Sequence, residues 1–164
     1  MRDSVLIFGS GMMGCAIGCC AALAHNKVIM YDADSAVLQK AKKRVSDNLN
    51  ELSDLGLCTM EQTEEAKKYI SVSRDVTQAC EQTKVVIEAV FENLEIKQNV
   101  FEMLDRLLPA AVPLLSNTSG LRITDISSRT KHPERTLTTH FWLPANLIPL
   151  VEIVIGDRSS RSLQ

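Results

Sequence analysis

The 164-residue sequence has no large excess of either charge, no regular cysteine spacing and no repeated or low-complexity segment. Its 18 basic and 20 acidic residues give a formal net charge of −2, which excludes a basic field that would attract nucleic acid. The five cysteines are an odd number, and no two of them are spaced as C-x-x-C. This usage predicts neither a disulfide framework nor a metal site, and it favours a reducing compartment.

A long uninterrupted apolar run is also missing. The stretch Val5–Ala24 is uncharged and ends in Ala22-Leu23-Ala24, which resembles a signal-peptidase site. However, three glycines within six residues and Ser10 interrupt it, whereas a membrane-spanning helix needs about 20 consecutive apolar residues. We therefore expect a cytoplasmic protein without a membrane partner, and an exported protein is the alternative interpretation.

Near its start, the chain has glycines with G-x-G-x-x-G spacing directly after an apolar run. Val5–Phe8 fits a strand buried on both faces, and the small residues of Cys15–Ala24 fit a buried helix that starts at the turn. In such a unit the first glycine makes the turn, the second admits a pyrophosphate and the third allows close helix packing. The expected phosphate-binding loop consists of Gly9, Ser10, Gly11, Met12, Met13 and Gly14.

A second predicted strand, Lys27–Asp32, ends in an acid. Asp32 lies 18 residues after Gly14, close to the roughly 20 expected for a carboxylate that accepts hydrogen bonds from an adenosine ribose. Ala33 and Asp34 follow, with no arginine to neutralise a 2′-phosphate. The sequence therefore predicts NAD as the cofactor, and a glycine turn followed by a solvated Asp is the alternative.

The rest of the chain alternates helix and strand patterns, and its length fits one domain. Together these features predict a single α/β domain with a Rossmann-type, doubly wound and mostly parallel sheet. The further expected helices are at 38–52, 59–68 and 121–128, with one after Asn93 and a turn or short helix at 75–82. The further expected strands are at 70–72, 85–90, 112–115, 135–140 and 151–155. Loops at 9–14, 32, 89–93 and 116–119 should then share one crevice.

The helix expected at 38–52 contains a concentration of basic residues, which has two interpretations. Lys40, Lys42, Lys43 and Arg44 lie mostly off its apolar stripe. Such a cluster is either a solvated face or a contact for the phosphates of a substrate tail.

Four motifs follow one another along the chain: Gly9–Gly14, Val86–Asn93, Ser116–Ser119 and His140–Pro144. In this order they resemble the NAD-binding domain of 3-hydroxyacyl-CoA dehydrogenases, over about Val5 to Gly156. The resemblance implies oxidation of the 3-hydroxyl of a 3-hydroxyacyl-CoA to the 3-ketoacyl-CoA, a step of fatty acid β-oxidation. The alternatives are a dehydrogenase of a non-CoA 3-hydroxy acid, similar to gulonate dehydrogenase, and a catalytically silent NAD-binding module; lambda-crystallins share much of the pattern.

His140 and Glu152 are the candidates for acid–base chemistry. Histidine suits a base near neutral pH, and the turns at Pro144 and Pro149 could fold Glu152 back to His140. In the resembling family the matching histidine takes the hydroxyl proton, and the matching glutamate orients the imidazole and stabilises its cation. The resemblance therefore implies a catalytic dyad.

The same resemblance assigns further roles at the crevice. Ser119 would hydrogen-bond the reacting oxygen, and Ala89, Glu92, Lys97 and Asn117 would lie along the cofactor. Without the motifs, Ser119 and Asn117 would be read as turn residues, and Glu92 and Lys97 as exposed charges near a helix start.

Two departures from the family pattern affect these expectations. Leu143 stands where the family typically has asparagine, which removes a polar group expected near the nicotinamide. The family also continues into a helical domain that forms the homodimer and supplies a further active-site asparagine. We therefore expect residues 1–156 to be the NAD-binding Rossmann domain, and 157–164 to be a polar tail or the start of a linker to a helical domain that this chain lacks.

Overall fold

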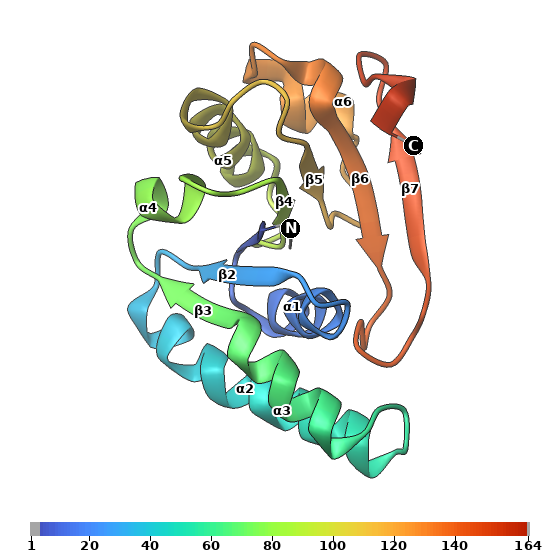
Figure 1. The fold of residues 1–164 in the computed structure, drawn as a ribbon. Helices are drawn as coiled ribbons and strands as arrows, with labels where there is room; N and C mark the ends of the chain where they lie inside the picture. Colours follow the sequence, from blue (N-terminus) through green and yellow to red (C-terminus); the bar gives the residue numbers. More distant parts are fainter. Residues whose placement is uncertain (1–3, 164) are drawn as a thin grey trace.

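Seven strands form one sheet in the order β3-β2-β1-β4-β5-β6-β7 (Figure 1). The structure, a computed structural model, describes residues 4–163. Strands β1 to β6 are parallel, and β7 pairs with β6 in the antiparallel direction. The chain runs outward from β1 in both directions, so the order reverses between β1 and β4. This arrangement confirms the predicted Rossmann-type, mostly parallel fold. The strands are β1 (Ser4–Phe8), β2 (Lys27–Tyr31), β3 (Ile70–Ser73), β4 (Val85–Glu88), β5 (Leu114–Ser116), β6 (Thr136–Phe141) and β7 (Val151–Ile155).

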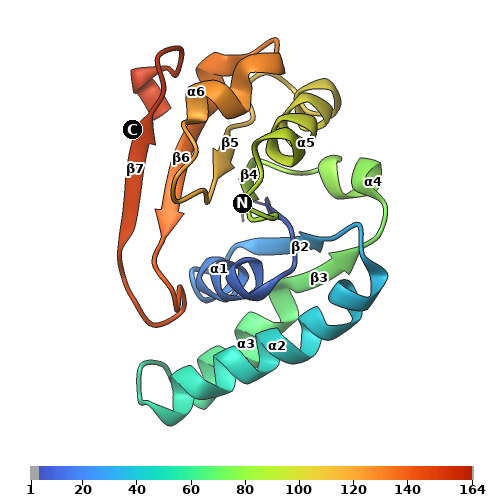
Figure 2. The same ribbon diagram turned by 180° about the vertical axis from the view of Figure 1, so that it is seen from behind.

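Helices cover both faces of the sheet, as Figure 1 and, from behind, Figure 2 show. The helices α1, α2 and α3 pack on one face, and α4, α5 and α6 lie on the other. No helix among residues 4–163 is both long enough and apolar enough to cross a membrane. The α-helices are α1 (Met12–Leu23), α2 (Ser35–Asp54), α3 (Met60–Tyr69), α4 (Val76–Cys80), α5 (Leu94–Leu107) and α6 (Ile123–Ile126), and short 3-10 helices occupy Ser127–Arg129, Pro133–Arg135 and Arg161–Leu163.

The central strand β1 explains why the domain has two cores. Its alternate side chains point to opposite faces: Val5 and Ile7 pack with α1 and α2, whereas Leu6 and Phe8 pack with α5. Every residue of β1 is buried, as predicted for a strand covered on both faces. The glycine loop that follows is thereby anchored at the middle of the sheet.

The cysteines are free thiols, and three of the five are buried. Cys15 and Cys19 belong to the core between α1 and α2. Burial raises the pKa of the Cys19 thiol to about 12, helped by the neighbouring thiols. These buried thiols are therefore structural rather than reactive.

Several element boundaries differ from the expected ones. Helix α1 begins at Met12 instead of Cys15, with Gly11 as its N-cap. Strand β4 ends at Glu88 instead of Val90, because the Val90 N–H donates to Glu88 Oε1 (2.7 Å) and not to a neighbouring strand. The capping box of α3 is confirmed, with Thr59 and Gln62 bonding each other's backbone N–H.

The residues after β7 lie against the domain. The Ser160 N–H donates to the Glu134 carbonyl (2.7 Å), and Arg158 Nη2 donates to the Ser127 carbonyl (3.1 Å). The expected boundary between residues 1–156 and 157–164 remains a prediction. The outermost residues of these two segments, 1–3 and 164, lie outside the described residues.

Candidate functional site

The glycine loop after β1 has the close contacts that its spacing predicts. Gly9 has φ +106°, and a Cβ on it would lie 2.6 Å from the Ala89 carbonyl oxygen. A Cβ on Gly14 would lie only 1.9 Å from the Gly9 oxygen, so both positions require glycine. A Cβ on Gly11 would meet nothing within 4 Å, so this position faces open space.

The start of α1 is suited to an anion. Its N-cap, Gly11, offers no side chain to bond the orphan N–H groups of the first turn, and no acidic residue lies in that turn. These N–H groups and the positive end of the helix dipole are therefore open to a phosphate.

Asp32 lies at the carboxyl end of β2 and is held by two backbone N–H groups. Its Oδ2 accepts from the Ser10 N–H (2.8 Å), and its Oδ1 accepts from the Asp34 N–H (2.9 Å). Ser10 itself is fully buried and donates its hydroxyl to the Tyr31 carbonyl (3.2 Å). Ser10 therefore fixes the acid in place through its backbone.

A cavity of ≈ 510 Å³ lies between the glycine loop, Asp32 and the loop after β4. Its lining is mostly apolar, with Met12, Met13, Ala89 and Val90 among the residues that form it. We call it the cofactor cavity. An apolar slot with the carboxylates of Asp32 and Asp34 just after β2 has the chemistry that an adenosine requires.

His140 and Glu152 are brought together by the pairing of β6 with β7. The two residues lie directly opposite each other in the antiparallel register, and His140 Nδ1 is 2.8 Å from Glu152 Oε2. Since the carboxylate occupies the Nδ1 side, Nε2 is the nitrogen left to exchange a proton with a substrate. The imidazole also lies near the Trp142 ring, with 5.7 Å between ring centroids.

A second cavity, of ≈ 320 Å³, is lined by Ser119, His140 and Glu152, together with residues of α6 and β7. We call it the reaction cavity. It brings together the three residues expected to be catalytic. No hydrogen bond within the described part of the chain uses the Ser119 hydroxyl, while the Ser119 N–H donates to Glu92 Oε1 (3.2 Å).

Between the two cavities lies a buried ionic network that the sequence reasoning missed in part. The Lys97 side chain is only 1% exposed, and its Nζ lies 2.7 Å from Glu88 Oε1 and 3.3 Å from Glu92 Oε2. The interpretation of Lys97 as an exposed charge is therefore wrong. Lys97 occupies the same apolar stripe of α5 as Phe101 and Leu104, and a lysine on such a stripe was the signal for a buried acidic partner.

Glu92 holds the loop that carries Ser119. Its Oε1 accepts from the Thr118 hydroxyl and from the N–H groups of Ser119 and Gly120 (3.2 Å each). Partial burial alone would raise the pKa of Glu92, but the bond from Thr118 and the charge of Lys97 outweigh it and keep that pKa below its usual value. Glu92 therefore stays ionised between Lys97 and the loop.

Asn117 connects the cofactor side to the dyad. Its N–H donates to the Glu88 carbonyl (2.8 Å), and its Oδ1 accepts from the Phe141 N–H (2.9 Å), one residue after His140. The sequence predicted Asn117 as a cofactor contact; in the structure, its amide oxygen links β5 to β6.

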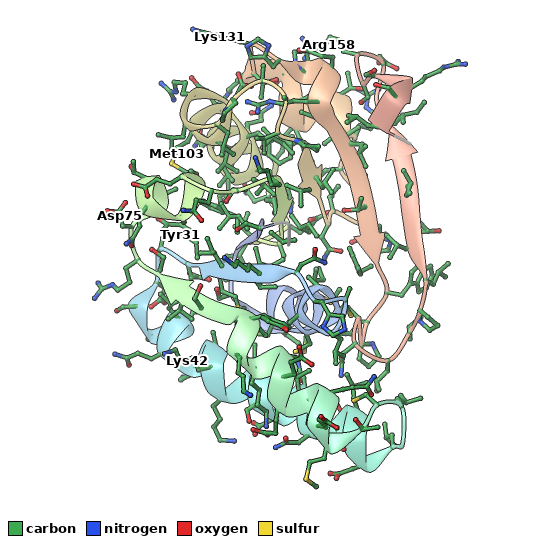
Figure 3. The ribbon with its side chains drawn as sticks, viewed as in Figure 1. Tyr31, Lys42, Asp75, Met103, Lys131 and Arg158 are labelled. Atoms are coloured by element: carbon green, nitrogen blue, oxygen red, sulfur yellow. The ribbon has the colours of Figure 1, made fainter. Side chains whose placement is uncertain are left out.

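The basic residues of α2 are divided rather than gathered into one site. Lys43 pairs with Asp47 (2.7 Å), and Arg44 Nη1 donates to the Ser10 carbonyl (3.5 Å). Lys42 is exposed on α2, where it lines a shallow pocket with Val72 of β3 and with Arg74 (Figure 3). In residues 4–163, no group of three or more His, Cys, Asp or Glu side chains is arranged to hold a metal ion.

The fold and the site define a class of protein. A glycine loop leads into a helix at the point where the strand order reverses, and an acid ends the second strand. These are the features of an α/β dinucleotide-binding domain. Residues 4–163 match the family described as "3-hydroxyacyl-CoA dehydrogenase, NAD binding domain", and the chain belongs to this family.

Individual relatives agree with this assignment. The chain is 35% identical over 156 residues to a probable 3-hydroxybutyryl-CoA dehydrogenase of Bacillus subtilis, covering 95% of this chain and 54% of that protein. It is 34% identical to a peroxisomal fatty acid beta-oxidation multifunctional protein of Arabidopsis thaliana, covering 95% and 22%. The crystal structure of 3-hydroxybutyryl-CoA dehydrogenase from Escherichia coli K12 matches with a TM-score of 0.92 and 32% identity, covering 99% of this chain and 34% of that one. The chain thus spans about half the length of the Bacillus relative and less of the other two.

Proposed function

We propose that the chain is the cofactor-binding and proton-accepting part of an NAD-dependent enzyme that oxidises a 3-hydroxyacyl-CoA to the 3-ketoacyl-CoA. The observation that carries this proposal is the 2.8 Å contact between His140 and Glu152 in a cavity that also contains Ser119. A base held by a carboxylate, beside a hydroxyl donor, is what oxidation of a secondary alcohol requires. The names of the relatives support the acyl-CoA class of substrate.

The residues present fit the cofactor. The open space at Gly11 and the free first turn of α1 would take its diphosphate, and Asp32 would take hydrogen bonds from the adenosine ribose. When bound, NAD supplies the acceptor for the hydride that leaves the substrate carbon. Ala89 and Val90 would close the apolar wall of the cofactor cavity.

The proton has a separate route. In the proposed step, His140 Nε2 accepts the proton of the substrate hydroxyl while the carbon loses its hydride. Glu152 holds Nδ1 and stabilises the imidazolium that forms. Ser119, whose loop is fixed by Glu92, would hydrogen-bond the reacting oxygen.

Two further expectations belong to this proposal. We propose that the active enzyme is a homodimer formed through a helical domain, as the resemblance to the family implies. We also propose a cytoplasmic location, which the five free cysteines favour.

Cofactor titration and turnover together test the proposal. The chain should bind NADH at least about tenfold more tightly than NADPH, because Asp32 repels a 2′-phosphate. In the complete natural protein, His140→Gln should lower kcat on 3-hydroxybutyryl-CoA by about 10²–10⁴-fold and leave NADH affinity unchanged. Activity on free 3-hydroxy acids alone would transfer the assignment to a non-CoA dehydrogenase. Full activity of His140→Gln would remove His140 as the base, and a chain that binds no NADH would refute the proposal.

A further inference from the structure

Glu88 is a fully buried acid at the carboxyl end of a central strand. It ends β4, between Phe8 of β1 and Ser116 of β5 in the sheet register, and its side chain is 0% exposed. An ionised carboxylate in such a place is strongly destabilising unless nearby groups compensate it. Its partners therefore indicate what the charge does.

Three donors from three different segments converge on the Glu88 carboxylate. Oε1 accepts from Lys97 Nζ in α5 and from the Val90 N–H in the loop after β4, both at 2.7 Å. Oε2 accepts from the Ser116 hydroxyl at the end of β5 (2.6 Å). An ammonium and a backbone N–H are donors only, so they require an acceptor, and the ionised carboxylate is the strongest one.

These bonds connect the walls of the two cavities. Val90 lines the cofactor cavity beside Ala89. On the other side, the Ser116 hydroxyl accepts from the Thr118 N–H (3.3 Å), and Thr118 lines the reaction cavity. One carboxylate thus fixes both the loop at 89–93 and the loop at 116–120.

The charge of Glu88 also determines what Glu92 can do. Lys97 lies between the buried Glu88 and Glu92, whose side chain is 44% exposed. Because Glu88 also pairs with Lys97, Glu92 can bind Lys97 through Oε2 and still hold the Ser119 loop through Oε1. Without the Glu88 charge, Glu92 would be the one carboxylate within 4 Å of Lys97 among the described residues, and it would be drawn from the loop.

We propose that Glu88 is a positioning residue for cofactor binding: through Lys97, Val90 and Ser116 it holds the two crevice loops at the spacing that NAD requires. This inference rests on the proposed function and adds to it. Glu88 acts through its neighbours, since it lines neither the cofactor cavity nor the reaction cavity.

The test compares Glu88→Gln with a matched control, Asp105→Asn. Asp105 forms an equally short buried ion pair with Arg135 (2.7 Å) and borders neither cavity. Each substitution keeps the shape of the side chain and removes one buried charge. NADH affinity is measured by titration at a temperature where circular dichroism shows each variant to be folded. Glu88→Gln should weaken NADH binding at least tenfold, and Asp105→Asn should change it less than twofold.

A second variant covers the case in which Glu88→Gln does not fold. Ser116→Ala removes one partner of Glu88 and leaves its charge, and it should weaken NADH binding about threefold. The inference is overturned if NADH affinity is unchanged in the folded Glu88→Gln protein or, failing that, in Ser116→Ala. It is also overturned if Asp105→Asn loses as much affinity as Glu88→Gln. Absence of NADH binding by the unsubstituted chain would instead refute the proposed function.

Discussion

Two buried ion pairs lie at opposite ends of α5, and they differ in what surrounds them. Glu88–Lys97 lies at its first turns and Asp105–Arg135 at its last turn; both pairs are 2.7 Å apart, with side chains at most 3% exposed. Arg135 Nη1 donates to the backbone carbonyls of Pro109 (2.6 Å) and Val112 (2.9 Å), whereas its buried Nε has no hydrogen-bond partner among the described residues. Lys97 instead shares its charge with Glu92, which faces the crevice loops.

Burial and distance alone do not separate a structural ion pair from a functional one. The remaining partners do. Arg135 donates hydrogen bonds to carbonyls at the end of α5 and in the following turn. The last carbonyls of a helix that ends inside a protein need such donors. Glu88 and Lys97 satisfy groups in loops that border two cavities. We therefore expect the Asp105–Arg135 pair to govern stability alone. The Glu88–Lys97 pair should govern both stability and cofactor affinity.

The largest effect in this comparison should come from Arg135→Met. It would leave the Asp105 carboxylate buried without its cation, and the carbonyls of Pro109 and Val112 without a donor. Removing one partner of a buried pair typically costs about 3–5 kcal/mol. Urea denaturation should show this loss, with NADH affinity of the folded protein unchanged. A loss below about 1 kcal/mol, or weaker NADH binding, would break the distinction between the two pairs.

An intermediate effect on the free energy of unfolding should appear at acid pH. Burial alone would raise the pKa of Asp105, but hydrogen bonds from Arg135 and from the Lys131 N–H hold it below its usual value. The folded pKa is then lower than the unfolded one, so the stabilisation is present above about pH 4 and is lost as the pH falls through the folded pKa. Each unit of depression corresponds to about 1.4 kcal/mol.

Denaturation curves between about pH 6 and pH 2.5 measure this dependence. The free energy of unfolding of the unsubstituted protein should fall steeply at the acid end, and that of Asp105→Asn should fall less. Parallel curves for the two proteins would show that Asp105 titrates as it does in the unfolded chain.

The smallest effect should come from an exposed pair on the same helix. Arg106 and Glu102 are four residues apart, with Nη2 and Oε1 separated by 3.3 Å and with both side chains exposed to solvent. Such pairs contribute about 0.3–0.5 kcal/mol, because water screens the charges and ordering the side chains costs entropy. Arg106→Ala should therefore change the free energy of unfolding by about 0.5 kcal/mol or less in urea denaturation. A change comparable to that of Arg135→Met would mean that burial is not what separates these pairs.

The sequence predicted well the features whose cause lies within a few residues. The glycine loop follows from the steric needs of Gly9 and Gly14, and the start of α3 follows from its capping box. The position of Asp32 follows from the length of one strand–helix–strand unit, and its attachment to the Ser10 N–H agrees with that expectation. The closeness of His140 and Glu152 was also predicted, because two proline turns separate two short strands.

The features that the sequence could not predict depend on segments that meet only in the folded chain. Lys97 was predicted to lie along the cofactor, with an exposed charge near a helix start as the alternative; its burial requires Glu88, which comes from strand β4. The end of β4 depends on the same carboxylate, which takes the Val90 N–H away from the sheet. The only local sequence signal for either feature is a lysine on an apolar stripe. The roles of single side chains at the cofactor remain predictions.

The hairpin of β6 and β7 constrains how the length of this protein can change in evolution. His140 and Glu152 face the same side of the sheet only because β6 and β7 pair in one particular register. One residue inserted within β7 ahead of Glu152 would turn its carboxylate to the opposite face and leave the imidazole without it. An insertion in the connecting segment 142–150 would leave the pairing of the two strands unchanged, although Ala145 in this segment is part of the core. The contact between His140 and Glu152 therefore depends on the backbone register as much as on the chemistry of the two side chains.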